Sequence, residues 1–521
     1  MFKFGAILAC AALTMPISAQ LFTPDTGFGD NGMVMVPFYG ATADCFIRVV
    51  RPQPDGRLIA VISRTDQTPR PLVLRRYHQN GTLDQTFGTN GEISVVVSEP
   101  GQNALVENAR IRPDGRILVL LRDQYRNLLV QFTADGALDP EFGIEGRALH
   151  AGPLSFDTFN LYIDEEGRAL VVGSHGAFAS VTRYMPDGSL DPSWGDDGIA
   201  SPLPPVFSSV AMDLAPLPGG GYVVTGFRSG WPPTASWVAR LDDEGQALAD
   251  FGNGGYALLD LLPDSLGNKR EALRRIVVRP DGSIVAVGTM ASLGPNLNVV
   301  LLGLTPDGQY DTSFGTNGTH QIQLPTGLNI LVPEIFARDD GRVLMAGVQT
   351  GPAIHDNRLV FHDFLPEGIP NEGFGPGGVQ SYTRPGMSIS SNGPANLLPN
   401  GDLVTNLNLA QLGQFKLSIV RLEQMELSTD MQEGSEKLSA VHVFPNPTAG
   451  VFHLHSDGIQ GAAQVTLSDA LGREVQHWAL PGSTLATGET LHLRAGLVNG
   501  VYSLRIAQGE EFRHTRLLVQ Q

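Results

Sequence analysis

Basic residues are scarce in this sequence of 521 residues. Its 35 lysines and arginines face 53 aspartates and glutamates, which gives a formal net charge of -18 at pH 7. A chain this acidic repels polyphosphate, so we expect no nucleic acid as a partner. Beyond the first twenty residues, the sequence also has no apolar run long enough to cross a membrane. We therefore expect no transmembrane span in the mature chain.

Cysteine and long helical patterns are scarce as well. The two cysteines are Cys10, near the N-terminus, and Cys45, in an apolar run where a buried thiol packs as a small hydrophobe. No segment keeps a helical period beyond about ten residues. Hydrophobic residues make up 42% of the chain, with 61 glycines and 36 prolines, so the sequence predicts an all-β protein with a large core and frequent turns.

The first nineteen residues have the pattern of a secretory signal peptide. Lys3 precedes an apolar stretch that runs to Met15, and small residues lead to Ala19, where we expect cleavage. The alternative is a lipoprotein signal at Ile7-Leu8-Ala9-Cys10, but the apolar run continues past the cysteine. After cleavage at Ala19, Cys45 is the one remaining cysteine, so an internal disulfide is excluded.

An internal repeat dominates the next four hundred residues. Its first mark is an aromatic residue followed by glycine, as in GTLDQTFGTNG at 81–91, and the copies are 52 to 63 residues apart. The seven aromatics are Phe28, Phe87, Phe142, Trp194, Phe251, Phe314 and Phe374. A second mark, such as PDGR at 54–57, falls between them in phase, and a third is an apolar strand that ends in another Asp-Gly turn. Each mark has hairpin chemistry, so a unit holds four short strands.

Small sheets that are covered on both faces must stack on one another, and seven of them close into a ring. Residues 20–425 are therefore predicted to form a seven-bladed β-propeller. An open solenoid is the alternative, because the seventh copy has the more polar run Leu403–Leu407 where a cap would lie. Whether the first strand completes the last blade stays open. The seven aromatics recur in every unit, which predicts a packing role between blades rather than a ligand site.

The G-x-L-D-x-x-F-G-x-x-G and PDGR marks resemble the delta-60 repeat family of secreted and surface proteins, which is thought to form propellers. The resemblance covers roughly residues 22–425. Copies four, five and seven depart from it, with Trp194 for Phe, a shortened ALADFGNGG at 247–255, and Pro370–Gly373 where Leu-Asp usually stands. The resemblance implies an architecture and leaves the activity open.

A polar, acidic linker at 426–437 precedes a second domain at 438–521. Its pattern predicts a small Ig-like β-sandwich of seven strands, near 441–444, 451–456, 463–469, 473–480, 490–494, 501–507 and 512–519. Four marks occur in order, and their key residues are Pro445, Asn446, Pro447, Gly450, Gly472, Asn499, Gly500 and Tyr502.

These marks resemble the type A C-terminal sorting domain of the type IX secretion system of Bacteroidetes. The resemblance implies the secretion machinery as a partner, and a location on the outer-membrane surface or outside the cell. An ordinary Ig-like binding domain is the alternative.

Motifs for catalysis and metal binding are weak. The sequence has no G-x-S-x-G, H-E-x-x-H, paired C-x-x-C or Walker loop, so no catalytic residue and no cofactor is predicted. Acidic turns such as Gly195–Gly198 offer oxygens to a structural Ca²⁺, but turn geometry explains their recurrence without an ion. The pairs His355-Asp356, His362-Asp363 and His453 with His455 fall short of a metal site, and we expect Tyr222, Trp231 and Trp237 to pack between blades rather than bind sugar.

Two functions stay open. The first is a secreted, non-catalytic propeller that serves as a scaffold or as a recognition module for an extracellular ligand, either glycan or protein. The second is a surface enzyme that acts on polysaccharide or peptide through carboxylates at the central face of the ring. Convergence of carboxylates from single copies into one pocket would favour the enzyme.

Overall fold

A computed structural model gives the fold of the chain. It describes residues 19–37, 45–64, 68–97, 103–123, 126–149, 158–205, 208–228, 235–259, 270–291, 298–325, 327–353, 357–383, 388–411, 414–427, 441–444, 448, 450–456, 461–468, 474–497, 500–508 and 511–519. The chain divides into two compact units, residues 1–429 and residues 430–521.

Six sheets of the first unit each contain four antiparallel strands that follow one another in the chain. They are β3 (Cys45–Pro52), β4 (Leu58–Arg64), β5 (Leu72–Tyr77) and β6 (Glu92–Val95); β7 (Ala104–Ile111), β8 (Ile117–Asp123), β9 (Arg126–Phe132) and β10 (Arg147–Leu149); β11 (Thr158–Ile163), β12 (Ala169–His175), β13 (Phe178–Tyr184) and β14 (Ile199–Ala200); β15 (Ser209–Pro216), β16 (Tyr222–Arg228), β17 (Ser236–Leu241) and β18 (Tyr256–Leu259); β19 (Arg270–Val278), β20 (Ile284–Ala291), β21 (Asn298–Leu304) and β22 (Thr319–Ile322); and β23 (Asn329–Ala337), β24 (Val343–Thr350), β25 (Arg358–Phe364) and β26 (Val379–Tyr382), with a short 3₁₀ helix, Pro376–Gly378, before β26.

The seventh sheet joins both ends of the unit. From the centre outward it has β27 (Ser388–Asn392) with β28 (Asn396–Leu397), then β29 (Leu403–Gln411), then β30 (Gln414–Leu427). Two N-terminal strands, β1 (Ala19–Pro24) and β2 (Met33–Val36), pair antiparallel with β30. The first strands of the chain therefore complete the last blade, which answers the question that the sequence left open.

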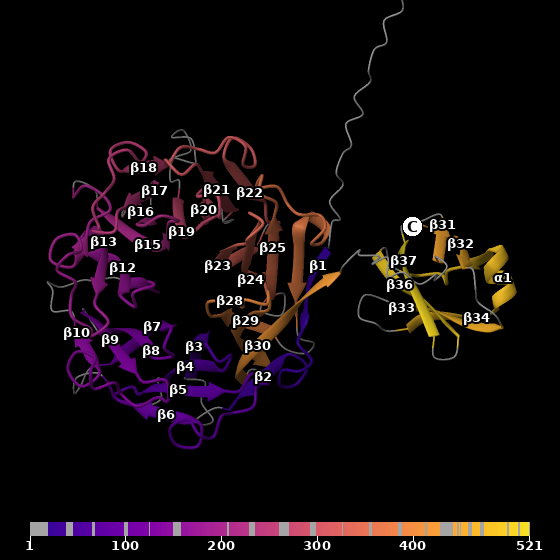
Figure 1. Cartoon of the computed structure of the whole chain (residues 1–521), viewed down its shortest axis with the longest axis horizontal. Helices are drawn as coiled ribbons and strands as arrows, with labels where there is room; N and C mark the ends of the chain where they lie inside the picture. The colour runs from indigo at the N-terminus through magenta and orange to yellow at the C-terminus, as the bar shows by residue number, and fades with distance from the viewer. Residues whose placement is uncertain are drawn as a thin grey trace, which may run out of the picture. The chain divides into compact units, whose positions relative to one another are not determined.

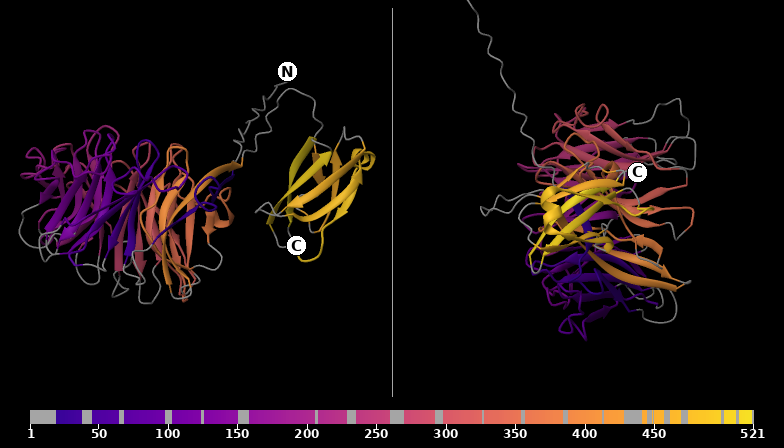
Figure 2. Two further views of the ribbon diagram at one scale, coloured as in Figure 1. Left: turned by 90° about the horizontal axis from the view of Figure 1, so that it is seen from below. Right: turned by 90° about the vertical axis from the view of Figure 1, so that its right-hand side faces the viewer.

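The ring is closed. The inner strands lie side by side from β3 through β7, β11, β15 and β19 to β23, and β29 of the seventh sheet lies beside β3. Figure 1 shows the seven sheets arranged around one axis, and Figure 2 shows their strands running between the two faces of the ring. The seven-bladed propeller is confirmed, and the open solenoid is wrong.

Polar residues of the seventh copy serve this closure rather than a solvent-facing cap. Thr405 and Asn406 on β29 are fully buried. The Asn406 side-chain amide donates to the carbonyl of Ile47 on β3 at 2.9 Å, and the Thr405 hydroxyl donates to the carbonyl of Gly393 at 3.3 Å. The bond from Asn406 joins the last blade to the first and the bond from Thr405 lies within the last blade, so both polar groups are satisfied where the apolar run is interrupted.

The aromatic of each mark lies between blades. All seven rings are at most 2% exposed. Six of them lie against the turn glycine of the following blade, because a Cβ added to that glycine would come within 3.2 Å of the ring. The pairs are Phe28 with Gly81, Phe87 with Gly136, Phe142 with Gly188, Trp194 with Gly245, Phe251 with Gly308, and Phe314 with Gly368. These six glycines have φ between +71° and +90°, a conformation that glycine adopts without steric cost.

A backbone hydrogen bond accompanies the aromatic contact. In five marks the glycine after the aromatic donates its N–H to the carbonyl just before the turn glycine of the next blade, at 2.6–2.9 Å. The interface between the sixth and seventh blades has no such turn, because the seventh blade is built from the two ends of the propeller segment. Phe374 instead meets Phe22 of β1 edge-on, with ring centroids 6.0 Å apart.

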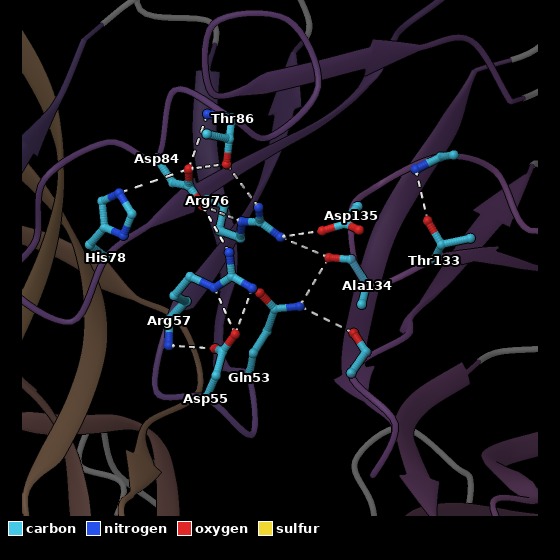
Figure 3. A network of polar contacts seen from close by, with 12 residues as sticks. Gln53, Asp55, Arg57, Arg76, His78, Asp84, Thr86, Thr133, Ala134 and Asp135 are labelled. Carbon is cyan, nitrogen blue, oxygen red and sulfur yellow. Dashed lines mark hydrogen bonds and ion pairs between the residues drawn. The ribbon is translucent and has the colours of Figure 1, made fainter.

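The acidic residue of the first mark holds a polar network together, shown for the second copy in Figure 3. Asp84 accepts hydrogen bonds from the backbone N–H and hydroxyl of Thr86, and pairs with Arg76 at 2.7 Å and with Arg57 of the PDGR turn at 3.1 Å. Burial alone would raise the pKa of Asp84, but the hydrogen bonds from Thr86 and Arg76 outweigh it and hold the pKa well below its usual range. The Arg76 guanidinium also lies 4.7 Å from the centre of the Phe87 ring, so the network and the aromatic contact support each other.

Where the repeat departs from its pattern, this network changes with it. In the sixth sheet Asp363 takes the place of the arginine and the neutral Asn371 that of the aspartate, and Asp363 accepts a hydrogen bond from Asn371 at 2.7 Å. In the fourth sheet Leu248 stands where the acid should be. Within the part of the chain that the structure describes, the buried Nε of Arg240 then has no hydrogen-bond partner.

The second unit is a sandwich of two sheets. One has the strands β31 (Val441–Phe444), β32 (Val451–Ser456) and β35 (Glu489–His492), and the other has β34 (Glu474–Pro481), β33 (Ala462–Ser468), β36 (Gly500–Gln508) and β37 (Glu511–Val519). One hydrophobic core, which includes Phe452, Val465 and Leu504, joins both sheets. The sequence did not predict the short helix α1 (Gly482–Thr487) between β34 and β35.

The contact between Phe87 and Gly136 generates a stability prediction. Phe87→Ala removes a fully buried ring and leaves a cavity, so we expect a loss of about 3 to 5 kcal/mol in the free energy of unfolding. Gly136→Ala should also be strongly destabilising, because its Cβ would lie 2.7 Å from the Phe87 ring at a φ of +90°. Urea unfolding of the purified protein measures both.

Gly176→Ala is the matched control. Gly176 also has a positive φ, of +63°, but nothing lies within 4 Å of an added Cβ. Only the backbone cost of about 1 kcal/mol should appear. Equal losses at Gly136 and Gly176 would contradict the packing role of the aromatic.

Candidate functional site

The inner strands carry the residues that face the centre of the ring. Each of the seven is irregular at one place, where its pairing with the next strand shifts register. The shift ends at Val49 in β3 and at the corresponding residue in the next five inner strands, but it falls earlier, between Ile389 and Ser391, in β27. A bulge re-aims the side chains that follow it, and bulges often lie next to functional sites.

After the bulge, two registers of each inner strand can be followed from copy to copy. Five residues before the first residue of the second mark stand Val49, Asn108, Asn160, Asp213, Arg275, Glu334 and Pro394. Three residues before it stand Arg51, Arg110, Tyr162, Ala215, Val277, Phe336 and Asn396. Unlike the aromatic marks, these positions differ from blade to blade, so the ring has one distinct arrangement of side chains at its centre.

Six of these side chains form a hydrogen-bonded belt across neighbouring blades. Arg51 donates to the amide oxygens of Asn396 at 2.7 Å and Asn108 at 3.0 Å. Asn108 donates to the amide oxygen of Asn160 at 2.7 Å, and Asn160 donates to a carboxylate oxygen of Asp213 at 2.5 Å. Arg110 donates to the oxygens of Asn108 and Asn160 at 3.4 and 3.2 Å. We call these residues, together with Arg275 and Glu334, the central belt.

The two carboxylates of the central belt are held by protein groups. The second oxygen of Asp213 accepts from the backbone N–H of Ile276 at 3.0 Å. Glu334 pairs with Arg275, whose Nε and terminal nitrogen lie 3.0 and 2.9 Å from one glutamate oxygen. Burial raises the pKa of Asp213 to about 6, although the nearby Arg275 opposes this. The charge of Glu334 raises the pKa of Arg275 against the effect of burial.

Two cavities follow the inner strands. The first has a volume of about 410 Å³ and is lined by central belt residues, including Arg51, Arg110 and Asp213. The second, of about 580 Å³, lies at the second-mark turns and includes Gln53, Arg112 and Asn400. Both volumes fall in the range of small-molecule sites. The two cavities have Pro52, Ile111 and Leu397 in common, so they adjoin each other along the channel.

Sequence reasoning missed the central belt. Its members come from all seven blades and leave no local motif, but comparison of the seven copies at a fixed distance from the PDG turn would have found them. The aromatic marks point elsewhere because they repeat in every copy, whereas the belt positions differ from copy to copy.

Several residues that the sequence singled out lie outside the described residues. They are Pro445, Asn446, Pro447, Gly472 and Asn499 of the C-terminal marks, the pair His355-Asp356, and Trp231. Of the other marks, Tyr502 is buried in the sandwich core, and Gly450 accepts a hydrogen bond from the N–H of Leu493 at 2.8 Å. Gly500 is the first residue of β36, opposite Val519, rather than part of the turn before it.

The remaining candidates are part of the packing. Trp237 and Tyr222 are buried, and Tyr222 meets Trp194 edge-on at 5.7 Å between centroids, so neither ring is available to stack on a sugar. His362 is buried and stacked with Phe364, and burial lowers its pKa to about 4. His453 lies 2.9 Å from the hydroxyl of Thr490 on the neighbouring strand.

The acidic turns use their carboxylates for turn geometry. Asp55, Asp114 and Asp340 each accept the backbone N–H of the residue two positions on, at 3.0–3.1 Å. Searched over the described part of the chain, His, Cys, Asp and Glu form no group of three that could hold a metal ion. The interpretation that these turns need no Ca²⁺ stays a prediction.

Comparison with protein families gives two matches. Residues 442–520 match a family described as a secretion system C-terminal sorting domain. Residues 53–87, 112–142 and 279–314 match a β-propeller domain of unknown function, DUF5122. No curated protein matches the chain at a significant level. Among the described residues, no helix has the length and apolar character needed to cross a membrane.

Solved structures with similar folds have diverse functions. A polysaccharide lyase, Uly1, is 10% identical with a TM-score of 0.43, over 77% of this chain and 93% of that one. An α-L-arabinanase of Penicillium chrysogenum is 11% identical with a TM-score of 0.36, over 79% and 98%. The Nup133 β-propeller domain of Vanderwaltozyma polyspora is 9% identical with a TM-score of 0.37, over 75% and 100%. At this level of similarity they carry no argument about activity.

The raised pKa of Asp213 predicts a pH-dependent stability. Between about pH 4 and pH 6 the folded protein keeps a proton that the unfolded chain releases, so this group's contribution to stability falls as pH rises through that window. Relative to Asp213→Asn, the wild-type protein should lose on the order of 2 to 3 kcal/mol of unfolding free energy between pH 4 and pH 7. Urea unfolding at a series of pH values measures the difference.

Asp187→Asn is the control for this series. Hydrogen bonds from Ser189 lower the pKa of Asp187, so its contribution is lost only as pH falls below about 4. Its difference from the wild-type protein should stay flat from pH 5 to pH 7. A flat difference for Asp213→Asn as well would show that Asp213 is ionised throughout.

Proposed function

Because the chain is a β-propeller protein with a type IX secretion sorting domain at its C-terminus, it is secreted to the cell surface or beyond, and we propose that its ring is a non-catalytic recognition module. The ligand binds in the central channel, at the central belt. The C-terminal domain brings the ring to that location through the secretion machinery, which is its partner during export.

The convergence of unrepeated side chains on one cavity carries this proposal. A packing role is repeated in every blade, as the seven aromatics are, whereas a ligand site needs a particular set of groups in one place. Arg51, Asn108, Asn160 and Asp213 come from four successive blades and line the same cavity of about 410 Å³. Amides and guanidinium groups supply directional hydrogen bonds, which is what recognition of a polar ligand requires.

The state of the two carboxylates supports binding over catalysis. Both oxygens of Asp213 accept hydrogen bonds, from Asn160 and from the N–H of Ile276, and Glu334 pairs with Arg275. A general acid or base has to exchange its proton with a substrate within hydrogen-bond reach. Groups held in this way position their neighbours more readily than they transfer protons.

A surface enzyme acting on polysaccharide or peptide is the second candidate, favoured by one observation. Two carboxylates from different blades, Asp213 and Glu334, line the same cavity, and the pKa of Asp213 is raised to about 6. An acid with a raised pKa beside a second carboxylate is the pairing that hydrolysis of a glycosidic bond uses.

Glycan and peptide arrays with the mature chain, residues 20–521, test the proposal. We expect binding to a defined ligand class, a tenfold or greater loss of affinity in Asn108→Ala, and no conversion of the bound ligand on prolonged incubation. Gln321→Ala, at an exposed position of the outer strand β22, is the control and should bind as the wild-type protein does. Turnover that disappears in Asp213→Asn or Glu334→Gln would favour the enzyme.

Export by the C-terminal domain gives a separate prediction. Deletion of residues 438–521 in the native host should leave the propeller in the periplasm, because the predicted signal peptide carries the chain across the inner membrane only. Conversely, a fluorescent reporter fused between the signal peptide and residues 438–521 should reach the surface or the medium. Cell fractionation and immunoblotting measure both.

The paired design separates export from folding. A deletion that unfolds the propeller would give degraded protein, whereas the reporter does not depend on the propeller. If the truncated protein reached the surface while the reporter stayed in the periplasm, the role of the domain in sorting would be refuted.

A further inference from the structure

Positive charge is concentrated at the centre of an acidic protein. The central belt contains three guanidinium groups, those of Arg51, Arg110 and Arg275, and two carboxylates, those of Asp213 and Glu334. The whole chain has a net charge of -18. A local excess of cationic groups in a narrow channel concentrates anions there, because the low-dielectric walls focus the field.

Among the residues that the structure describes, two of the three arginines have only neutral hydrogen-bond partners. The Arg51 guanidinium donates to the amide oxygens of Asn108 and Asn396 and to the backbone carbonyl of Ala109. Arg110 donates to two amide oxygens, and its hydrogen bonds, at 3.2 and 3.4 Å, are longer than those of Arg51. Burial lowers the pKa of both groups, because it disfavours the charged form. A buried guanidinium without a carboxylate is costly, and a bound anion would compensate it.

The adjoining cavity continues this pattern toward the mouth of the channel. Arg112 follows Arg110 by two residues and is also buried. It donates to the side-chain oxygen of Gln131 and to the carbonyl of Gly167, which are again neutral groups. Within the described part of the chain, one of its terminal nitrogens has no hydrogen-bond partner. Arg110 and Arg112 therefore form a line at the end of β7, from the central belt to the second-mark turns.

We propose that the central belt binds the carboxylate of an acidic sugar, a uronate residue of an extracellular glycan, with Arg110 and Arg51 as its ligands. This inference rests on the proposed function, since it names the ligand class of the same site. A guanidinium fork matches the two oxygens of a planar carboxylate. The amides of Asn108, Asn160 and Asn396 beside it both donate and accept, which suits the hydroxyl groups of a sugar ring.

The lining favours a sugar over an acidic peptide. Peptide recognition commonly relies on apolar pockets for side chains or on a groove for an amphipathic helix. The belt instead surrounds its arginines with side-chain amides on three sides, from β7, β11 and β28. A polar cavity of about 410 Å³ is of the size that encloses a small ligand rather than a folded segment.

Isothermal titration calorimetry of the mature chain, residues 20–521, tests this assignment. The probes are di- to tetrasaccharides of galacturonate and glucuronate, the corresponding neutral oligosaccharides, sodium sulfate, and an acidic peptide of similar charge. We expect at least tenfold tighter binding of one uronate series than of its neutral counterpart. Added salt should weaken that binding.

Arg110 variants locate the site. Arg110→Gln should weaken uronate binding at least tenfold, and Arg110→Lys should weaken it less, because the charge stays and the fork is lost. Arg147→Gln removes one charge from the outer strand β10 and should change nothing. The melting temperature of Arg110→Gln should be equal to or above that of the wild-type protein, because an uncompensated charge is removed. A marked fall would instead assign Arg110 a structural role.

The outcomes separate this inference from the proposed function. Equal binding of uronates and neutral sugars, lost in Asn108→Ala, would overturn the carboxylate site and keep recognition in the channel. Tighter binding of the acidic peptide would overturn the sugar assignment. Binding of sulfate and uronate with equal affinity would show a site for any anion. Absence of uronate binding at millimolar concentration would overturn the inference outright.

Discussion

The contact between an aromatic ring and a glycine of the next blade is the interaction on which the ring depends. Each blade offers its aromatic to its neighbour and receives one in return, so six interfaces repeat one geometry. The aromatic side chain packs closely only against a residue without a Cβ, and the tight turn needs a positive φ. Glycine meets both requirements at one position. The Asp–Arg network of the second copy lies directly over this contact, which places the charged residues of the repeat in the service of packing.

Because these contacts between blades hold the propeller together, the side chains at its centre are free to differ from blade to blade. The inner strands are anchored by their turns and by the bulge, and side chains after the bulge such as Asn108, Asp213 and Glu334 line the cavity there. This is why Asn108, Asp213, Arg275 and Glu334, which differ in chemistry, can occupy equivalent positions in one fold. Recognition then requires only changes at these positions, without changes in the contacts that hold the blades together.

Much of the architecture could be predicted because the repeat is expressed in local turn chemistry. The PDG and aromatic-Gly marks predict hairpins. Because the marks recur in the same order seven times, they predict seven blades. How the seventh blade is completed could not be predicted from the sequence, because the pairing of β1 and β2 with β30 joins the two ends of the propeller segment and has no local signal. Thr405 and Asn406 looked like a weakened strand, since hydrogen bonds to another blade cannot be inferred from a polar residue alone.

The candidate site was harder to predict for a related reason. Its residues are near neighbours in space but lie on different blades, so that Arg51 and Asn396 are hydrogen-bonded across the junction of the first and last blades. No bulge is visible in the hydrophobic pattern, because the inserted residues, such as Arg48 and Met212, share no chemistry. Only the register relative to the PDG turn, compared over all copies, carries the information.

The pairing of the first strand with the last has a consequence for the order of events during export. Strand β30 is the last propeller strand in the chain, and until it is available β1 and β2 have no sheet to join. Six blades can assemble vectorially from local hairpins, but the seventh waits for a contact between ends nearly four hundred residues apart. The propeller can therefore close only after its whole segment is available. The sorting domain directly follows β30 in the chain, so it comes just after the strand that completes the seventh blade.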